Sequence, residues 1–162
     1  MAYTMATRLD KKILLVDLDP QANLTEIMLK TKDNFATINN SLMNIFLNKG
    51  NVEDSIYGID LIPVQADFYL YPRFLEREFE DDNQRLPFLS EQLKDIKEKG
   101  EYDLIILDTS LTLSLANDTT YYACDFIVIV LQTQIMALQG AETLIQYLTE
   151  NIVEKYGSNA DV

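Results

Sequence analysis

The sequence predicts an α/β fold with a doubly wound, mostly parallel sheet, because apolar runs of strand length alternate with helical patterns along the chain. The runs are almost continuously hydrophobic, which is typical of strands buried on both faces. With 48% hydrophobic and 24% charged residues, and only five Gly and four Pro, the composition is that of an ordered globular protein. A length of 162 residues favours one compact domain over the whole chain, residues 1–162.

Each predicted strand is a short apolar run between polar or turn residues. The runs are residues 12–17, 59–64, 102–108 and 126–131. Because parallel sheets bind ligands beyond the carboxyl ends of their strands, functional residues are expected just after these runs.

The predicted helices have apolar residues at helical spacing and recognisable ends. They cover residues 21–30, 38–47, 69–79, 86–99 and 137–155. Gly100 marks the end of the fourth, since glycine readily adopts the left-handed conformation that closes a helix.

Composition and charge exclude several classes of function. A net charge of −13 would repel a phosphate backbone, so direct DNA binding by these residues alone is disfavoured. A chain with no His and one Cys cannot form a His-based triad, a Cys/His dyad or the usual zinc site of four Cys and His ligands. The longest apolar run, residues 126–131, is far below the roughly 20 residues of a membrane helix, and the polar start lacks a signal peptide, so the sequence predicts a cytoplasmic protein.

Two carboxylates follow the first predicted strand. Asp17 and Asp19 are two residues apart, so an extended backbone would project both to the same side. Asp19 followed by Pro20 is also a common way to begin a helix, with Asp as the N-cap. That explanation does not cover Asp17, which lies directly on an apolar strand where an unpaired buried charge is costly.

The third predicted strand also closes on a carboxylate, Asp108, after four apolar residues. This is the form of a Walker B strand, whose carboxylate can hold a water molecule of the Mg²⁺ that bridges nucleotide phosphates. Taken alone, the pattern is equally compatible with an Asp that caps the next turn. Its combination with Asp17 and Asp19 favours the magnesium site.

The segment KKILLVDLDPQANLT at residues 11–25 resembles the second nucleotide motif of the ParA/MinD-type (Soj-like) plasmid or chromosome partition ATPases, a deviant Walker A P-loop NTPase family. Residues 58–64, 102–109, 123–130 and 137–140 resemble the same family in the same order. The resemblance implies a sheet of the P-loop NTPase type. It also implies that Asp19 organises the attacking water and couples hydrolysis to the dimer state. By the same resemblance Asp17 supports the metal shell and Asp108 is the Walker B acid that holds Mg²⁺ through water.

For the intact family, the resemblance implies ATP and Mg as cofactors, a centromere-binding ParB-type protein and non-specific DNA as partners, and no membrane. This chain departs from the family in having no G-x-x-x-x-G-K-[ST] phosphate loop, whose N–H groups and Lys hold the phosphates. Residues 1–9 resemble the back half of the helix that follows the loop. We therefore expect a domain truncated at both ends, which is inactive as given and binds neither cofactor.

Two other interpretations stay open. A non-catalytic ParA-like binding protein would keep the fold and hydrolyse nothing. A phosphoacceptor receiver domain would also place an acidic pair at Asp17 and Asp19 and a phosphorylated Asp at Asp108, although the long separation and the lack of Lys after the last strand disfavour it.

The missing strand of the phosphate loop also has a structural consequence. In the family it lies beside the strand that ends at Asp108, so its loss exposes strand edges. We expect residues 102–108 and 126–131 either to close directly on each other or to receive a strand from a neighbouring molecule, with self-association in solution.

Overall fold

The computed structural model describes residues 1–32, 41–48, 59–110, 112–132 and 135–161. Within them, a parallel sheet has the order β2-β1-β3, formed by Ile13–Asp17 (β1), Ile59–Ile62 (β2) and Leu104–Asp108 (β3). Ile13 lies opposite Ile59 on one side and Leu104 on the other. These are three of the four predicted strands, and their parallel arrangement is confirmed.

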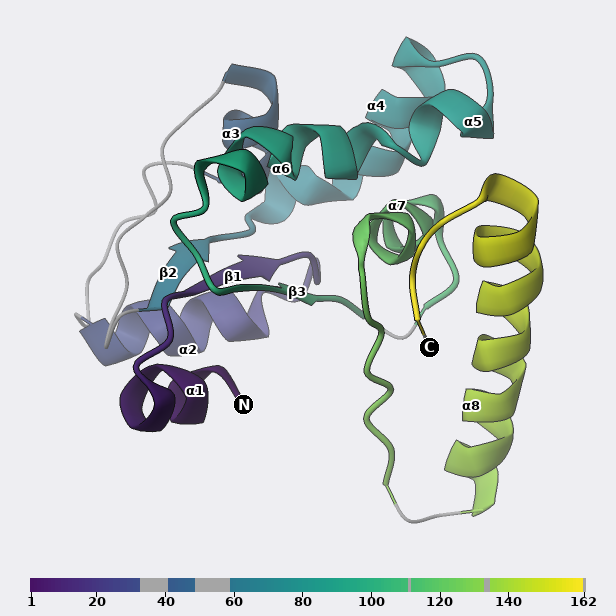
Figure 1. Ribbon diagram of the computed structural model, residues 1–162. Helices are drawn as coiled ribbons and strands as arrows, with labels where there is room; N and C mark the ends of the chain where they lie inside the picture. The colour runs from purple at the N-terminus through teal and green to yellow at the C-terminus, as the bar shows by residue number, and fades with distance from the viewer. Residues whose placement is uncertain (33–40, 49–58, 111, 133–134, 162) are drawn as a thin grey trace.

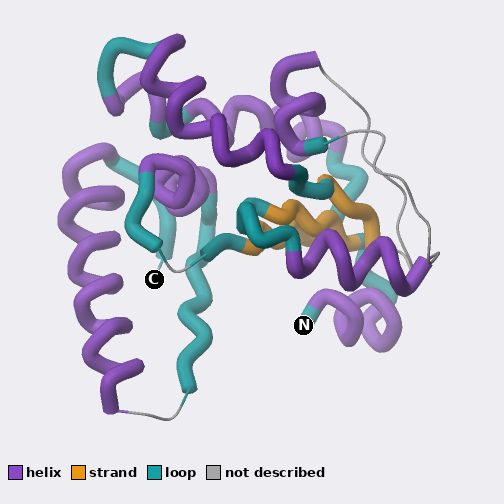
Figure 2. Tube along the Cα trace, turned by 180° about the vertical axis from the view of Figure 1, so that it is seen from behind, coloured by secondary structure: helices purple, strands orange, loops and turns teal. Residues whose placement is uncertain are grey.

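Helices cover both faces of this sheet (Figures 1 and 2). On one face, Ile13 and Leu15 pack with α1 (Ala2–Leu9) and α2 (Asn23–Lys32). On the other, Leu14 and Val16 pack with the helices between β2 and β3. All five residues of β1 are buried, because the strand has a neighbour on each side and a helical layer above and below. The doubly wound α/β class is therefore confirmed.

The remaining helices include the predicted ones, with shifted ends, and others that were not predicted. They are α3 (Leu42–Asn48), the 3₁₀ helix η1 (Ala66–Leu70), α4 (Tyr71–Glu78), α5 (Asp82–Arg85), α6 (Phe88–Lys99), α7 (Leu115–Ala123), α8 (Ile135–Leu148) and a π-helical continuation, η2 (Thr149–Glu154). Gly100 ends α6 in the left-handed conformation, as predicted. Residues 38–40 of the predicted second helix lie outside the described residues.

The sequence interpretation missed the short helix α5 and the longer helix α7. The start of α7 is marked by Ser114, whose side chain accepts a hydrogen bond from the backbone N–H of Asn117. The helix contains two Thr and two Tyr, which have modest helix propensity. Tertiary packing stabilises it instead, because Tyr121 joins Leu148 and Ile152 in a small core of its own.

The predicted strand at residues 126–131 is wrong. Phe126 forms one isolated parallel bridge with Asp161, and the residues that follow have no strand partner in the described chain. In the described chain β3 pairs only with β1. The expected direct pairing of residues 102–108 with residues 126–131 is therefore wrong as well. The physical reason is that Ile127 packs against the α7, α8 and η2 core, which holds the segment apart from β3. Pairing with a neighbouring molecule stays a prediction.

Among the described helices, none combines the length and the apolar character that a membrane crossing requires.

Candidate functional site

The carboxyl ends of β1 and β3 bring two of the predicted site residues together. Asp17 and Asp108 are direct partners in the register of the two strands. The backbone N–H of Leu18 donates to the Asp108 carbonyl at 2.7 Å, which extends the pairing one residue beyond β1. Residues 91 positions apart in the sequence therefore form one edge.

The Asp17 side chain is fully buried and both of its oxygens accept backbone hydrogen bonds. Oδ1 accepts from the N–H of Asp19 at 3.1 Å, and Oδ2 accepts from the N–H of Thr25 at 2.8 Å. Thr25 is in the first turn of α2, where N–H groups have no partner within the helix. Asp17 thus caps α2 from a strand, which explains how its charge is tolerated in the core.

Asp19 is half-buried and folds the turn between β1 and α2. Its Oδ1 accepts from the N–H of Gln21 at 2.9 Å, and its carbonyl accepts from the N–H of Ala22 at 2.9 Å. Ala22 has a φ of 57° and α2 begins only at Asn23. The interpretation of Asp19 as the N-cap and Pro20 as the first helical residue is therefore wrong, since Asp17 does the capping.

Asp108 is exposed at the end of β3. Partial burial raises the pKa of its carboxyl group, and the negative charges of Asp17 and Asp19 raise it further. No Lys or Arg forms an ion pair with any of these three carboxylates in the described part of the chain. The edge is negative and uncompensated, so it favours a cation.

The residues present fit the acidic half of a magnesium nucleotide site. Carboxylate oxygen is the ligand that Mg²⁺ prefers, and Mg²⁺ commonly keeps several waters and one or two protein carboxylates. Among the described residues, no group of three or more Asp, Glu, Cys or His is placed to bind a metal ion directly. A triphosphate needs donors and positive charge, and the three carboxylates supply neither.

Two residues of the site region escaped the sequence interpretation. The hydroxyl oxygen of Thr25 accepts a hydrogen bond from the N–H of Val64 at 3.1 Å, which links α2 to the end of β2. Asn117, buried on α7, donates to the carbonyls of Ser110 and Thr112 and accepts from the hydroxyl of Thr109 at 2.6 Å. It therefore fixes the loop after Asp108. A Ser three residues before it was the one sequence signal, because Ser is a favoured N-cap.

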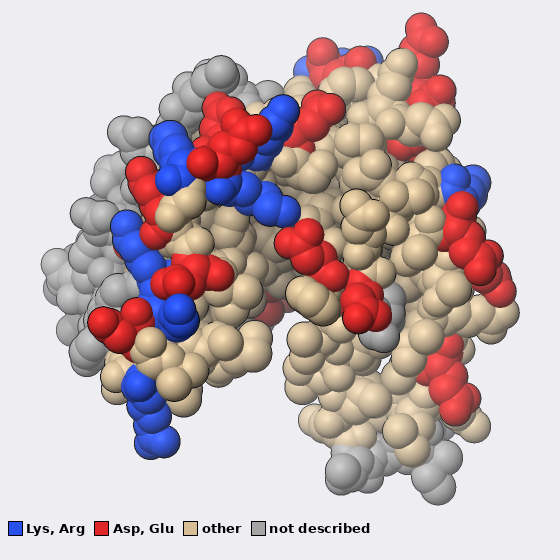
Figure 3. All heavy atoms as spheres, in the orientation of Figure 1, with Lys and Arg blue, Asp and Glu red and all other residues tan. Residues whose placement is uncertain are grey.

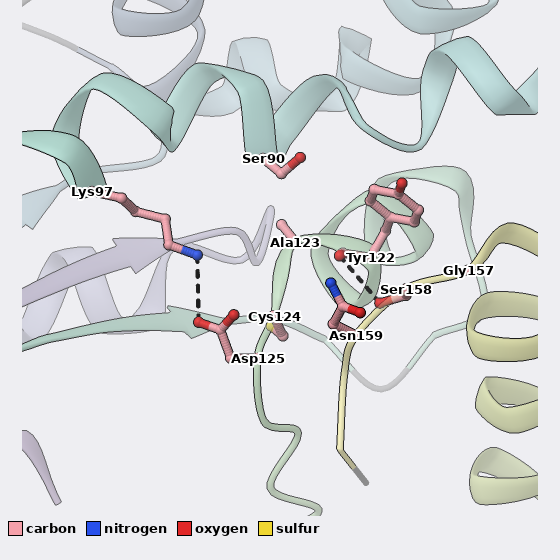
Figure 4. A pocket seen from close by; sticks show the side chains of 9 residues that line it. All are labelled: Ser90, Lys97, Tyr122, Ala123, Cys124, Asp125, Gly157, Ser158 and Asn159. Atoms are coloured by element: carbon pink, nitrogen blue, oxygen red, sulfur yellow. Dashed lines mark hydrogen bonds and ion pairs between the residues drawn. The ribbon is translucent and has the colours of Figure 1, made fainter.

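A cavity of about 180 Å³ lies away from this edge, beside the carboxyl end of α6. Figure 4 shows its lining, in which Lys97 pairs with Asp125 at 3.4 Å and the Ser158 hydroxyl donates to the Tyr122 carbonyl. Burial raises the pKa of the Cys124 thiol to about 11, so it stays protonated near neutral pH.

Comparisons with known proteins identify the family and the fold. A family model described as an AAA domain, AAA_31, matches residues 1–161. The virulence plasmid ParA family protein pGP5-D of Chlamydia psittaci is 27% identical over 161 residues, which cover 94% of this chain and 55% of that protein. The chain thus spans about half the length of such curated relatives.

Solved structures share the fold. A plasmid partition protein from Borrelia burgdorferi has a TM-score of 0.71 at 18% identity, covering 92% of this chain and 66% of that one. Cobyrinic acid a,c-diamide synthase from Mycobacterium smegmatis, with a bound ATP analogue and magnesium, has a TM-score of 0.75 at 21% identity, covering 98% and 61%.

Proposed function

This chain belongs to the AAA_31 family of AAA domains, among the ParA/MinD-type partition ATPases, and we propose that it is the acidic half of the nucleotide site of such an ATPase, acting in plasmid or chromosome segregation. In this proposal, residues 1–162 form one partial domain of that ATPase. The observation that carries the proposal is the pairing of Asp17 with Asp108 at one sheet edge, with Asp19 on the adjoining turn.

Each carboxylate has a distinct proposed role. Asp108, exposed at the strand end, would hold Mg²⁺ through a water molecule in the complete site. Asp19 keeps one carboxylate oxygen without a hydrogen-bond partner in the described chain, and that oxygen orients the attacking water. Asp17 supports the metal shell by fixing the turn that positions Asp19, since its own oxygens are engaged. Magnesium, when bound, supplies charge neutralisation at the phosphate oxygens.

The cofactor proposal follows from charge. The sequence has no G-x-x-x-x-G-K-[ST] loop, and the described edge offers only carboxylates to a triphosphate. Like charges repel, so this chain alone does not hold ATP at micromolar affinity. Without the phosphate oxygens the edge also lacks the ligands that would complete a Mg²⁺ site, so Mg is not held tightly either. We propose that a family member with its phosphate loop holds both ATP and Mg.

The proposed partners are a ParB-type centromere-binding protein and non-specific DNA, engaged by the complete ATPase. The chain's net charge of −13 opposes binding to a phosphate backbone. DNA contact in the complete protein would therefore come from basic residues beyond these.

A second candidate is a non-catalytic ParA-like binding protein. It is favoured by the engagement of both Asp17 oxygens and one Asp19 oxygen in backbone hydrogen bonds, which is what a purely structural role would need. The two candidates differ in whether Asp19 affects turnover once a phosphate loop is present.

Calorimetric titration with MgATP tests the proposal. The chain as given should show no micromolar binding, whereas a fusion that adds a strand, a phosphate loop and the front half of the helix continued by α1 should bind. A micromolar Kd for the chain alone would overturn the charge argument. Failure of a folded fusion to bind would overturn the acidic-half assignment.

A further inference from the structure

Three consecutive side chains of α7 form hydrogen bonds with three different parts of the molecule. Asn117 binds the loop that follows β3, Asp118 binds α8, and Thr119 binds α4. Asn117 and Thr119 are only 2 and 0% exposed, so their bonds lie inside the protein. Figures 1 and 2 show α7 between the layer that contains α4 and α6 and the helix α8. One helix therefore connects the loop beside the candidate site with a helix that lies away from the sheet.

The Asn117 side chain uses both its donors and its acceptor on that loop. Its Oδ1 accepts from the Thr109 hydroxyl at 2.6 Å, and its Nδ2 donates to the carbonyls of Ser110 at 2.7 Å and of Thr112. An amide side chain has two N–H donors and one carbonyl oxygen, so each group finds a partner here. Thr109 directly follows Asp108. Asn117 thus fixes the backbone next to that carboxylate.

The bond between Asp118 and Tyr147 fixes the other side of α7. The Tyr147 hydroxyl donates to Asp118 Oδ1 at 2.9 Å. Desolvation and the Asp118 carboxylate raise the pKa of the Tyr147 hydroxyl, which therefore stays protonated and keeps donating at neutral pH. A hydrogen bond to a carboxylate is stronger than one between neutral groups.

Charged contacts contribute little else to the position of α7. Asp118 is the one charged residue of this helix, and it forms no ion pair in the described part of the chain. Figure 3, in the orientation of Figure 1, shows few charged side chains over α7. The bond from Tyr147 and the apolar packing of Tyr121 with Leu148 and Ile152 therefore hold α7 against α8 and η2.

We propose that Asp118 and Tyr147 are positioning residues for the loop that follows Asp108. They act on it through Asn117, which is next to Asp118 on the same helix. Backbone hydrogen bonds make so short a stretch of helix rigid. Rotation of α7 after loss of the Tyr147 bond would therefore move the Asn117 amide away from the loop carbonyls. The meaning of this link for a magnesium carboxylate rests on the proposed function, whereas the link itself does not.

Hydrogen exchange of the Asn117 side-chain amide, followed by NMR on the unaltered chain and its variants, measures the link. These hydrogens exchange when their bonds to the loop carbonyls open. Tyr147→Phe removes only the hydroxyl and should speed the exchange about fivefold or more. Tyr156→Phe is the matched control, because the Tyr156 hydroxyl donates at 3.2 Å to Asp82 on α5 and not to α7. It should change the exchange rate less than about twofold.

Variants of Asp118 separate the hydrogen bond from the size of the side chain. Asp118→Asn keeps an oxygen that accepts from Tyr147, so the Asn117 amide should exchange at close to the unaltered rate. Asp118→Ala removes the acceptor and should match Tyr147→Phe. The slowest backbone amides of β1 report global unfolding in each variant. Acceleration of those amides as large as that of the Asn117 amide would show general destabilisation and overturn the positioning role.

An Asn117 amide that exchanges equally in the unaltered chain and in Tyr147→Phe would also overturn the proposal, as would equal effects of Tyr147→Phe and Tyr156→Phe. None of these results bears on the acidic-half assignment, which the MgATP titration of the phosphate-loop fusion tests separately. Failure of that titration would remove the nucleotide function and leave the link between α8 and the loop intact.

Discussion

The buried carboxylate of Asp17 accepts a hydrogen bond from the backbone N–H of Thr25 at 2.8 Å, so a strand residue caps the helix that follows it. Asp17→Asn should lower the free energy of unfolding by about 1.5–3 kcal/mol, because one backbone N–H then faces an amide donor within the core. Urea unfolding measures the change. Asp19→Asn is the control and should cost less than about 1 kcal/mol, since Asp19 is half-buried. Equal losses for the two variants would contradict the capping role.

Thr25 extends this connection to β2. Its hydroxyl oxygen accepts from the N–H of Val64 at 3.1 Å in a buried position. Thr25→Val keeps the size of the side chain but leaves that N–H unsatisfied, which should cost about 1–3 kcal/mol. Thr25→Ser keeps the hydroxyl, so it should unfold at a urea concentration closer to that of the unaltered chain. The opposite order would show that the methyl group, and not the hydrogen bond, matters at this position.

Repulsion at the sheet edge predicts a pH dependence. Partial desolvation and the charges of Asp17 and Asp19 raise the pKa of the Asp108 carboxyl group above its ordinary value of 3.8, although most of the side chain is exposed. A carboxyl group with a raised pKa stabilises the fold fully below its ordinary pKa and loses that contribution as pH rises through the raised value. Asp108→Asn should therefore be more stable than the unaltered chain at pH 7, by less than about 0.5 kcal/mol because the side chain is exposed.

Thermal unfolding in metal-free buffer at several pH values measures this difference. The advantage of Asp108→Asn should disappear below pH 3.8, where both side chains are neutral. An advantage that stayed constant with pH would rule out charge repulsion as its cause.

Hydrogen bonds from the Asn117 side chain fix the loop that follows Asp108. Its amide donates to Ser110 and Thr112 carbonyls and is buried, so Asn117→Asp would place a carboxylate against carbonyl oxygens. We expect a loss of about 1–3 kcal/mol or more in unfolding free energy. Faster amide exchange at residues 112–114 should accompany it. Ser114→Ala, which removes only the cap of α7, should cost about 1 kcal/mol and leave the hydrogen bonds of Asn117 to the loop intact.

The sequence predicted the strands that are buried in the sheet. Three apolar runs became β1, β2 and β3, because a strand with covered faces needs continuous hydrophobicity. The run at residues 126–131 has the same composition, yet it has no ladder, since pairing depends on a distant partner that local pattern does not reveal. Composition alone predicted a strand there, although no neighbouring strand pairs with it in the described chain.

The position of the candidate site at the strand ends could be predicted from the sequence, but the hydrogen bonds of its residues could not. Strand ends indicated Asp17 and Asp108 as one edge, and the register brings them together. The capping of α2 by Asp17 could not be foreseen, because the bond spans eight residues and the helix begins after a left-handed Ala22. Helix α7 was missed for a similar reason, since its stability comes from packing with Leu148 and Ile152.

ATP turnover by a phosphate-loop fusion carrying Asp19→Ala tests the central claim most directly. If Asp19 orients the attacking water, the variant should lose about 10²-fold or more in kcat while its Kd for MgATP changes only a few-fold. Asp19→Asn should fail similarly, although it can keep the hydrogen bond from Gln21 that shapes the turn. Turnover that survives in a folded Asp19→Ala fusion would contradict the account and leave Asp19 as a turn residue alone.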